Sequence, residues 1–163
     1  MILKWTIGIV LVIAISYGLI LIARKDQQPL PGEALTIQGQ EHIAVGASHP
    51  EYNSNPPTSG WHYAQPARWG VHQTELPDEQ LIHNLEHGGI WISYMGIDDS
   101  TRSALEKIAT SQSKVIIEPR AKNDAPIVLA AWGRLLKLEK FDEQTIVAFI
   151  GANRNRSPEP RAQ

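Results

Sequence analysis

The sequence contains no cysteine, and this absence excludes several kinds of site at once. Disulfide bonds, thiolate metal sites, iron–sulfur clusters and thiol catalysis all require that residue. The formal net charge at pH 7 is only -2, so the chain lacks the strong field that recruits nucleic acid or acidic lipid. A glycine-rich phosphate loop, an oxygen-rich calcium loop and a nucleophile-elbow motif are missing as well. Histidine and carboxylate side chains are therefore the main candidates for chemistry, and no nucleic-acid partner is expected.

Charged residues are also missing from Trp5 to Ala23, where most positions are Ile, Leu, Val or Ala. This run is close to the roughly 20 residues that a helix needs to cross a bilayer. We therefore expect residues 1–24 to form a transmembrane anchor and residues 25–33, which contain two prolines, to form a linker. A cleaved secretory signal and a buried core helix are the alternatives.

Basic residues flank the apolar run on both sides, with Lys4 before it and Arg24 and Lys25 after it. The positive-inside rule therefore does not fix the orientation of the anchor. A cytoplasmic N-terminus followed by an exported domain is the commoner arrangement for a short leader. We expect a single-pass protein of the plasma membrane whose C-terminal domain is exported, periplasmic or extracellular.

Hydrophobic periodicity and turn residues predict one globular α+β domain at 34–155 and a flexible polar tail at 156–163. The domain is expected to contain a mixed β-sheet and about three helices. A strand–helix–strand succession predicts a parallel pair, and the short connection after it predicts an antiparallel partner. The predicted strands lie at 89–95, 114–119 and 125–138, and the predicted helices at 77–87, 98–112 and 141–154.

Two segments before the first predicted helix are less regular. Residues 34–46 alternate imperfectly and are broken by Gly39, which predicts a hairpin or two short strands. Residues 48–66 are rich in Pro, Gly, Ser and Asn but also contain aromatic side chains that can pack. This composition predicts a long ordered loop, and such loops are commonly functional.

His83 and His87 are four residues apart, so a helix places both imidazoles on one face. Glu86 falls on the same side, whereas Leu81 and Leu85 project to the opposite side. Neutral imidazoles at this spacing can chelate one divalent cation. The same spacing also occurs on solvent-exposed polar faces of helices, so the two histidines alone do not define a metal site.

A metal site needs three or four ligands, and the others must come from elsewhere in the chain. His62 follows Pro56-Pro57 and Gly60, a rigid corner that can hold an imidazole over a helix end. Alternatively, the corner is purely structural and His62 hydrogen-bonds a carbonyl within it. A thioether suits reduced copper, whereas imidazole suits copper or zinc. Glu79 is a further candidate, but the expected ligands are His62, His83 and His87, with His42 or Met95 completing the shell and Glu86 in or beside it. Copper is preferred over zinc. Thr58, Ser59 and Asn84 are expected to orient the imidazoles.

The segment from His83 to His87 also matches H-x-x-E-H, the inverted zinc-protease motif in which the glutamate is the general base. Those enzymes are much larger, and the predicted helix ends here at Gly88. No downstream glutamate lies in a helical context that would supply a third zinc ligand. The sequence therefore favours a protein that is not an enzyme.

Four segments, NPPTSGWHY, PDEQLIHNLEHGG, AAWGR and SPEP, together resemble a bacterial family known only as a domain of unknown function, DUF3105. The resemblance covers roughly Glu41 to Glu159 and implies an N-terminal membrane-spanning segment followed by one exported domain. It implies no activity. Trp61 stands where relatives commonly have proline, which leaves the direction of His62 open. The positions that match the family pattern are His42, Tyr52, Pro56, Pro57, Thr58, Ser59, Gly60, His62, His83, Asn84, Glu86, His87 and Gly88.

The sequence thus favours a membrane-anchored, exported protein that binds a transition metal through histidines and handles or stores it. The competing hypothesis is a non-enzymatic interaction module, or an accessory subunit, that contacts another membrane protein through the same helix and loop.

Overall fold

The computed structural model describes residues 13–18 and 29–162 of the chain. The chain divides into two units, Met1–Leu30 and Pro31–Gln163, and residues 13–18 of the first unit are helical. Most of the expected anchor and the first part of the expected linker lie outside the described residues. Within the described ranges, no helix combines the length and the apolar character needed to span a membrane. The anchor and its orientation therefore stay predictions.

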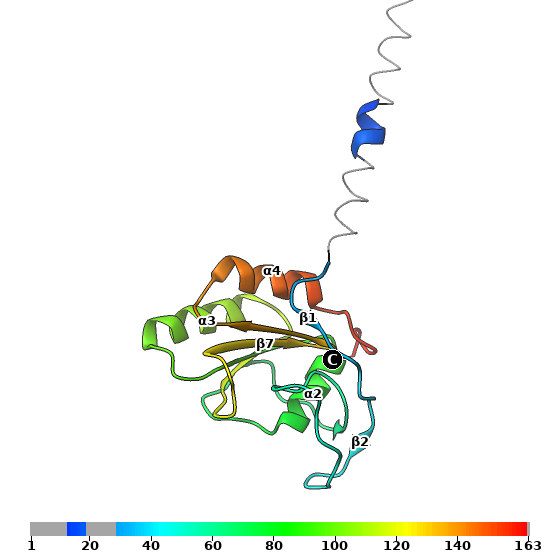
Figure 1. Cartoon of the computed structure of the whole chain (residues 1–163), viewed down its shortest axis with the longest axis vertical. Coiled ribbons are helices and arrows are strands. Elements are labelled where there is room, and N and C mark those ends of the chain that lie inside the picture. Colours follow the sequence, from blue (N-terminus) through cyan, green and yellow to red (C-terminus); the bar gives the residue numbers. More distant parts are fainter. Residues whose placement is uncertain (1–12, 19–28, 163) are drawn as a thin grey trace, which may run out of the picture. The chain divides into compact units, whose positions relative to one another are not determined.

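The second unit is a small α+β domain in which one mixed sheet carries helices on both faces (Figure 1). Its three helices and its mixed sheet confirm the α+β class predicted for this domain. In chain order, its elements are β1 (Glu33–Ala34), β2 (His42–Ile43), β3 (His62–Tyr63), β4 (Gly70–Val71), α2 (Asp78–Glu86), β5 (Ile90–Tyr94), α3 (Asp99–Ser111), β6 (Val115–Pro119), β7 (Ile127–Ala131), β8 (Arg134–Leu138) and α4 (Glu143–Asn153).

Six strands form the main sheet, in the order β1-β8-β7-β5-β6-β4. β5 and β6 are parallel and are connected through α3, as the strand–helix–strand pattern predicts. β7 pairs in the antiparallel sense, as expected, but its partner is β5 and not β6, the strand that precedes it in the chain. This placement makes β5 a central strand whose first residue lies four positions after the end of α2.

The two short strands predicted within 34–46 are present, but they do not form a hairpin. β1 pairs with β8 in the main sheet, whereas β2 pairs in parallel with β3 as a separate two-stranded sheet. The register of that second sheet sets His42 opposite His62. Backbone hydrogen bonds from Gly60 to Gly39 and from His62 to Glu41, at 3.0 and 3.1 Å, fix this register.

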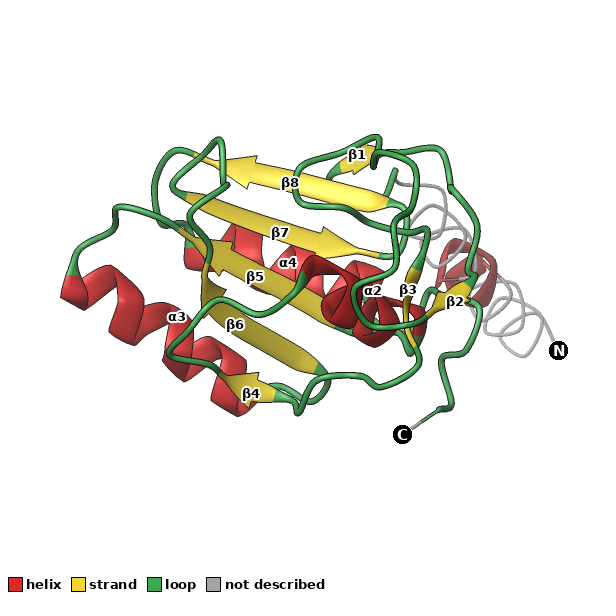
Figure 2. Cartoon of the chain, turned by 90° about the horizontal axis from the view of Figure 1, so that it is seen from below, coloured by secondary structure: helices red, strands yellow, loops and turns green. Residues whose placement is uncertain are grey.

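Alternate residues of β5 point to opposite faces of the sheet and so belong to different cores. Ile90 and Ile92 lie in the core that α3 and α4 cover, whereas Trp91 lies in the core under α2. Leu81 and Leu85 of α2 are both fully buried in this second core, which confirms the predicted apolar side of the helix. Burying one leucine side chain contributes about 2 kcal/mol, so these contacts fix α2 against the sheet (Figure 2).

Arg120 fixes the first turn of α2 to the long loop that leads to β3. Its guanidinium is 2% exposed and donates to both carboxylate oxygens of Asp78, at 2.9 and 2.8 Å. It also donates to the Asn55 side chain at 2.6 Å and lies 5.6 Å from the Trp91 ring centre. One buried cation therefore connects the helix to the proline-rich corner.

The segment after α4 lies against the C-terminal end of α2. The last carbonyls of a helix lack partners within it. Here the Asn155 N–H donates to the Gly88 carbonyl at 2.9 Å, and the Glu159 N–H donates to the Glu86 carbonyl at 3.1 Å. The Lys114 ammonium donates to the carbonyls of His87 and Pro160, both at 2.8 Å. The polar composition that predicts a flexible tail does not indicate these contacts.

Candidate metal centre

Three imidazoles and one carboxylate meet where β2 and β3 lie beside the last turns of α2 (Figure 2). One ligand atom from each of His42, His62, His83 and Glu86 lies within 4.8 Å of the others. The ring centres of the three histidines are 4.7 to 5.2 Å apart. The β2–β3 pairing supplies two of the rings and α2 supplies the remaining groups, so residues distant in sequence converge on one point.

His62 is completely buried, and the hydrogen bond of one ring nitrogen determines what the other can do. Its Nδ1 lies 2.7 Å from the Gly60 carbonyl oxygen, so Nδ1 carries a proton and donates it. Nε2 then carries the lone pair of a neutral ring, and it lies 3.0 Å from Oε2 of Glu86. Two acceptors approach this closely only when a proton or a metal cation lies between them. The predicted alternatives for His62, a carbonyl partner and a metal ligand, are therefore compatible.

His83 repeats this arrangement on the helix. Its Nδ1 lies 2.7 Å from the Tyr63 carbonyl oxygen and donates to it, which leaves Nε2 as the acceptor nitrogen of the neutral ring. That Nε2 lies 3.0 Å from Nε2 of His87. Metal-binding histidines usually donate their second N–H to a carbonyl or carboxylate, which fixes the ring and its tautomer. Both buried imidazoles of the cluster show this feature.

None of the side chains expected to orient the imidazoles has a hydrogen bond to a ring of the cluster among the described residues. Asn84 binds the backbone of Ala67 through both ends of its amide, at 2.8 and 2.9 Å. The Ser59 hydroxyl accepts from the Gln38 N–H at 3.0 Å, and the buried Thr58 hydroxyl has no hydrogen-bond partner. Backbone carbonyls orient the rings instead, and no sequence pattern identifies which carbonyls will do so.

The electrostatic environment keeps the helix imidazoles neutral at ordinary pH. Burial lowers the pKa of His83, the Tyr63 carbonyl opposes this effect, and the neighbouring His87 adds to the lowering. Burial likewise lowers the pKa of His87, against the opposing charges of Glu159 and Glu86. A neutral imidazole can offer its lone pair to a metal without first losing a proton.

The cluster is open to solvent on the side of His42, whose side chain is 51% exposed. Its Nε2 lies 3.7 Å from Oε2 of Glu86, and its ring stacks in parallel on that of His83. Glu86, in contrast, is 3% exposed. An ion can therefore approach over His42 and meet a buried carboxylate behind it.

Two further predicted ligands, His87 and Met95, lie at different distances from the cluster. His87 adjoins the cluster through His83, and its Nε2 also lies 3.6 Å from Oε2 of Glu159. Met95 follows β5 at the end away from α2, is 40% exposed, and lies in a cavity with Tyr94 and Arg102. A five-residue strand separates the two ends by about 16 Å, so the structure places Met95 outside the cluster.

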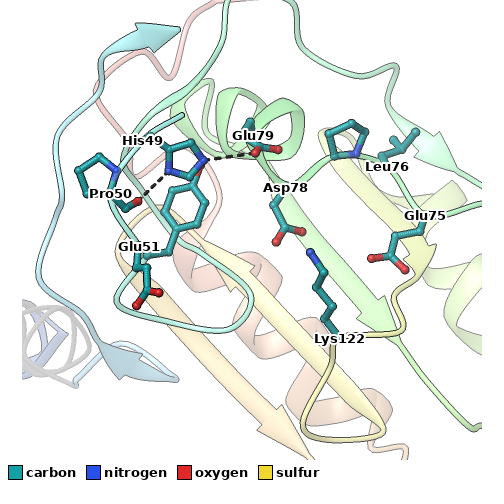
Figure 3. A pocket seen from close by; sticks show the side chains of 10 residues that line it. His49, Pro50, Glu51, Glu75, Leu76, Asp78, Glu79 and Lys122 are labelled. Carbon is teal, nitrogen blue, oxygen red and sulfur yellow. Dashed lines mark hydrogen bonds and ion pairs between the residues drawn. The ribbon is translucent and has the colours of Figure 1, made fainter. Parts of the chain in front are cut away.

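Glu79 and His49 lie around a separate cavity on the N-terminal side of α2. His49 Nε2 lies 3.3 Å from Oε1 of Glu79, and its Nδ1 lies 2.7 Å from the Pro50 carbonyl oxygen (Figure 3). The cavity has a volume of about 580 Å³, and its lining includes Asp78 and Lys122. Glu79 is thus paired one helical turn before His83 and does not belong to the cluster.

Glu159 lies beside His87 and is not among the residues expected from the sequence to form the site. It lies in the SPEP motif, on which the family resemblance partly rests, but its position in a polar tail conceals its proximity to His87. The backbone bond between Glu159 and Glu86 brings it there. The motif was a usable signal, whereas its spatial placement was not predictable from local sequence.

The family model described as "Protein of unknown function (DUF3105)" matches residues 45–163. The match includes His62, His83, Glu86 and Glu159, and it begins after His42. No curated protein and no solved structure matches the chain. Because the family model covers well over half of the sequence, the chain belongs to the DUF3105 family of proteins of unknown function.

Proposed function

We propose that the chain binds a divalent transition metal ion through His42, His62, His83 and Glu86, and that it handles or stores the metal. The approach of His62 Nε2 to Glu86 Oε2, at 3.0 Å with the other ring nitrogen already donating to a carbonyl, carries this proposal. A metal ion between these two acceptors uses both lone pairs at once. Neither group needs to rotate away from its present partner for this to happen.

The distances fit one ion with small adjustments. Ligand atoms around a tetrahedral ion are roughly 3.3 Å apart when each bond is about 2.05 Å long. The His62–Glu86 and His42–Glu86 separations, 3.0 and 3.7 Å, lie on either side of that value. The largest separation in the cluster, up to 4.8 Å, has to shorten on binding. The exposed ring of His42 has the freedom to move.

Three imidazoles and a carboxylate, without sulfur, suit Zn²⁺ and Cu²⁺. The sequence-based preference for copper depended partly on Met95, and its position removes the argument for the reduced ion. Copper is still expected to bind more tightly than zinc, because affinities of nitrogen and oxygen sites for divalent ions generally peak at Cu²⁺.

We place this metal site on the outer side of a membrane, held there by the N-terminal apolar run. Support comes from the uncharged sequence between Trp5 and Ala23. In the described part of that run, the helical residues Ile13, Ile15 and Tyr17 have side chains 58 to 63% exposed. Exposed apolar side chains on a helix suit a lipid environment. Protease protection of the C-terminal domain in spheroplasts, from which the outer layers of the cell have been removed, tests this arrangement: an exported domain is cleaved by added protease, whereas a cytoplasmic one is not.

The metal proposal is tested by measuring bound metal after the purified full chain has been loaded with Zn²⁺ or Cu²⁺ and gel-filtered. Stoichiometric metal is expected in the wild type, and loss of it in the double variant His62→Ala plus His83→Ala. His42→Ala is the milder variant, because that side chain is 51% exposed and contributes least to packing. We expect it to weaken binding by at least tenfold, since losing even a group that only orients a ligand costs about 10- to 100-fold in affinity.

His72→Ala is the matched control for these variants. Among the described residues, the His72 ring bonds only the nearby Arg68 carbonyl, at 2.7 Å, and lies outside the cluster. This variant should therefore keep the full metal content. Equal metal content in the wild type, the double variant and the control contradicts a site at the cluster.

The competing interaction module has one supporting observation. Val45 and Ile37, 82 and 45% exposed, lie on either side of β2 and expose apolar surface close to His42 in the chain. If a membrane-protein partner docks here, Val45→Ser weakens the complex and leaves metal content unchanged. A folded chain that binds no metal but forms such a complex favours this alternative.

A further inference from the structure

A second set of metal-binding atoms adjoins the first, around the ring of His87. His87 Nε2 lies 3.0 Å from His83 Nε2 on one side and 3.6 Å from Glu159 Oε2 on the other. Both distances are close to the roughly 3.3 Å that separates ligand atoms on one tetrahedral ion. His87 Nε2 is thus flanked by an imidazole nitrogen and a carboxylate oxygen, and the exposed Glu159 carboxylate has to move toward His83 for all three atoms to hold one ion.

The C-terminal segment is fixed so that Glu159 faces this point. The Glu159 N–H donates to the carbonyl of Glu86 at 3.1 Å, inside the last turn of α2. The Lys114 ammonium binds the carbonyl oxygens of Pro160 and Ala162, at 2.8 and 3.2 Å. The main chain around Glu159 is therefore held by hydrogen bonds on both sides, whereas its carboxylate is 58% exposed and can adjust.

His87 differs from His62 and His83 in how its ring is held. Its side chain is 9% exposed, and its buried Nδ1 has no hydrogen-bond partner. All of its polar contacts are made by Nε2, toward His83 and Glu159. The buried Nδ1 thus leaves one polar atom of the ring unpaired, so the fold does not use the full hydrogen-bonding capacity of His87.

We infer that the cluster takes two divalent transition metal ions, the first on His42, His62 and Glu86 and the second on His83, His87 and Glu159. This inference rests on the proposed metal-binding function. When one ion is bound, His83 is close enough to join the first set. When two are bound, His83 completes the second set, and each ion keeps one coordination position open for water or an exogenous ligand.

The charges predict the order of loading. Glu86 is 3% exposed and acts on the first ion from a buried position, where its charge is weakly screened. Glu159 is more exposed, and the positive charge of Lys114 acts on His87 in the second set. The second ion is therefore bound more weakly than the first, and Zn²⁺ titration should show two steps.

Metal stoichiometry of the full chain tests the inference, measured by native mass spectrometry during titration with Zn²⁺. The wild type is expected to bind two ions and Glu159→Gln one, with the tighter step unchanged. Glu139→Gln is the matched control, because Glu139 is exposed and lies near Phe141, away from the cluster. It should bind two ions. Because the Glu159 side chain is largely exposed, its substitution leaves the fold intact.

Each outcome decides between the proposals. A wild type that binds one ion, or a Glu159→Gln variant that still binds two, overturns the second site and leaves the proposed function standing. A wild type that binds none overturns the proposed function itself. Electron paramagnetic resonance of the chain loaded with two equivalents of Cu²⁺ adds a spatial test: ions about 4 Å apart, as in two-metal sites, must be magnetically coupled. Two uncoupled copper signals contradict adjacent sites.

Discussion

Replacing Asn84 by alanine should destabilise the domain strongly without directly removing a metal ligand. Asn84 is 1% exposed and lies on α2 between His83 and Leu85. Its Oδ1 accepts from the Ala67 N–H at 2.8 Å, and its Nδ2 donates to the Ala67 carbonyl at 2.9 Å. The side chain thus satisfies both polar groups of one buried backbone residue.

The magnitude follows from the groups left without partners. A buried donor or acceptor that loses its partner costs about 1–3 kcal/mol, so the two groups of Ala67 together cost roughly 2–6 kcal/mol. The better helix propensity of alanine offsets at most about 0.7 kcal/mol of this. The net loss, roughly 1–5 kcal/mol, is a substantial fraction of the about 5–15 kcal/mol that stabilises a typical domain.

Urea unfolding of the full chain, followed by tryptophan fluorescence, measures this loss. Gln144→Ala is the control, because it removes an amide from an exposed helical position and should change stability by no more than about 0.5 kcal/mol. A loss below about 1 kcal/mol for Asn84→Ala refutes the reasoning on the Ala67 bonds. Metal affinity of the folded variant should stay close to wild type. A 10- to 100-fold loss of affinity with little loss of stability would instead support the sequence-based role of Asn84 in orienting an imidazole.

Three further predictions concern the surroundings of the site. Burial raises the pKa of Glu118 to about 8 from an ordinary 4.5. The stability that the protonated carboxyl contributes is therefore complete below pH 4.5 and is lost as the pH rises through 8. Glu118→Gln should gain urea resistance over wild type between pH 5 and 8.5. Arg120→Met leaves Asp78 without its bidentate partner and should cost about 3–5 kcal/mol in urea unfolding. Gly89→Ala places a Cβ 2.5 Å from the Trp69 ring and should cost about 1–3 kcal/mol, seen as a lower midpoint in thermal unfolding.

The sequence predicts the extent of α2 and the residues on each of its two sides well, because both depend on local periodicity. Leu81 and Leu85 are in the core, and the two histidines share the other side, as the helix geometry requires. The burial of that other side is not predictable from the helix. His83 and His87 are 5 and 7% exposed because β3 and the C-terminal segment, both distant in the chain, cover them.

The same limit applies to the ligand set. His42 and His62 belong to it because two very short strands pair, and two-residue strands give almost no periodic signal. Met95 lies close to His87 in the sequence, but β5 carries it to the opposite end of the sheet. Proximity in the sequence therefore did not predict which residues form the cluster, whereas the type of donor atom did.

Glu86 gives the most general physical reason for a cation at this position. A carboxylate that is 3% exposed loses most of its hydration, and the uncompensated cost of such burial is several kcal/mol. Its nearest charged or chargeable neighbours are the imidazoles of His62 and His42. The helix end on which it lies also carries a partial negative charge, and the hydrogen bonds to the carbonyls of Glu86, His87 and Gly88 offset this only in part. The fold therefore concentrates negative potential and imidazole lone pairs at one opening. A proton stabilises this arrangement at a single ring nitrogen, whereas one divalent metal ion can bind several ligand atoms at once.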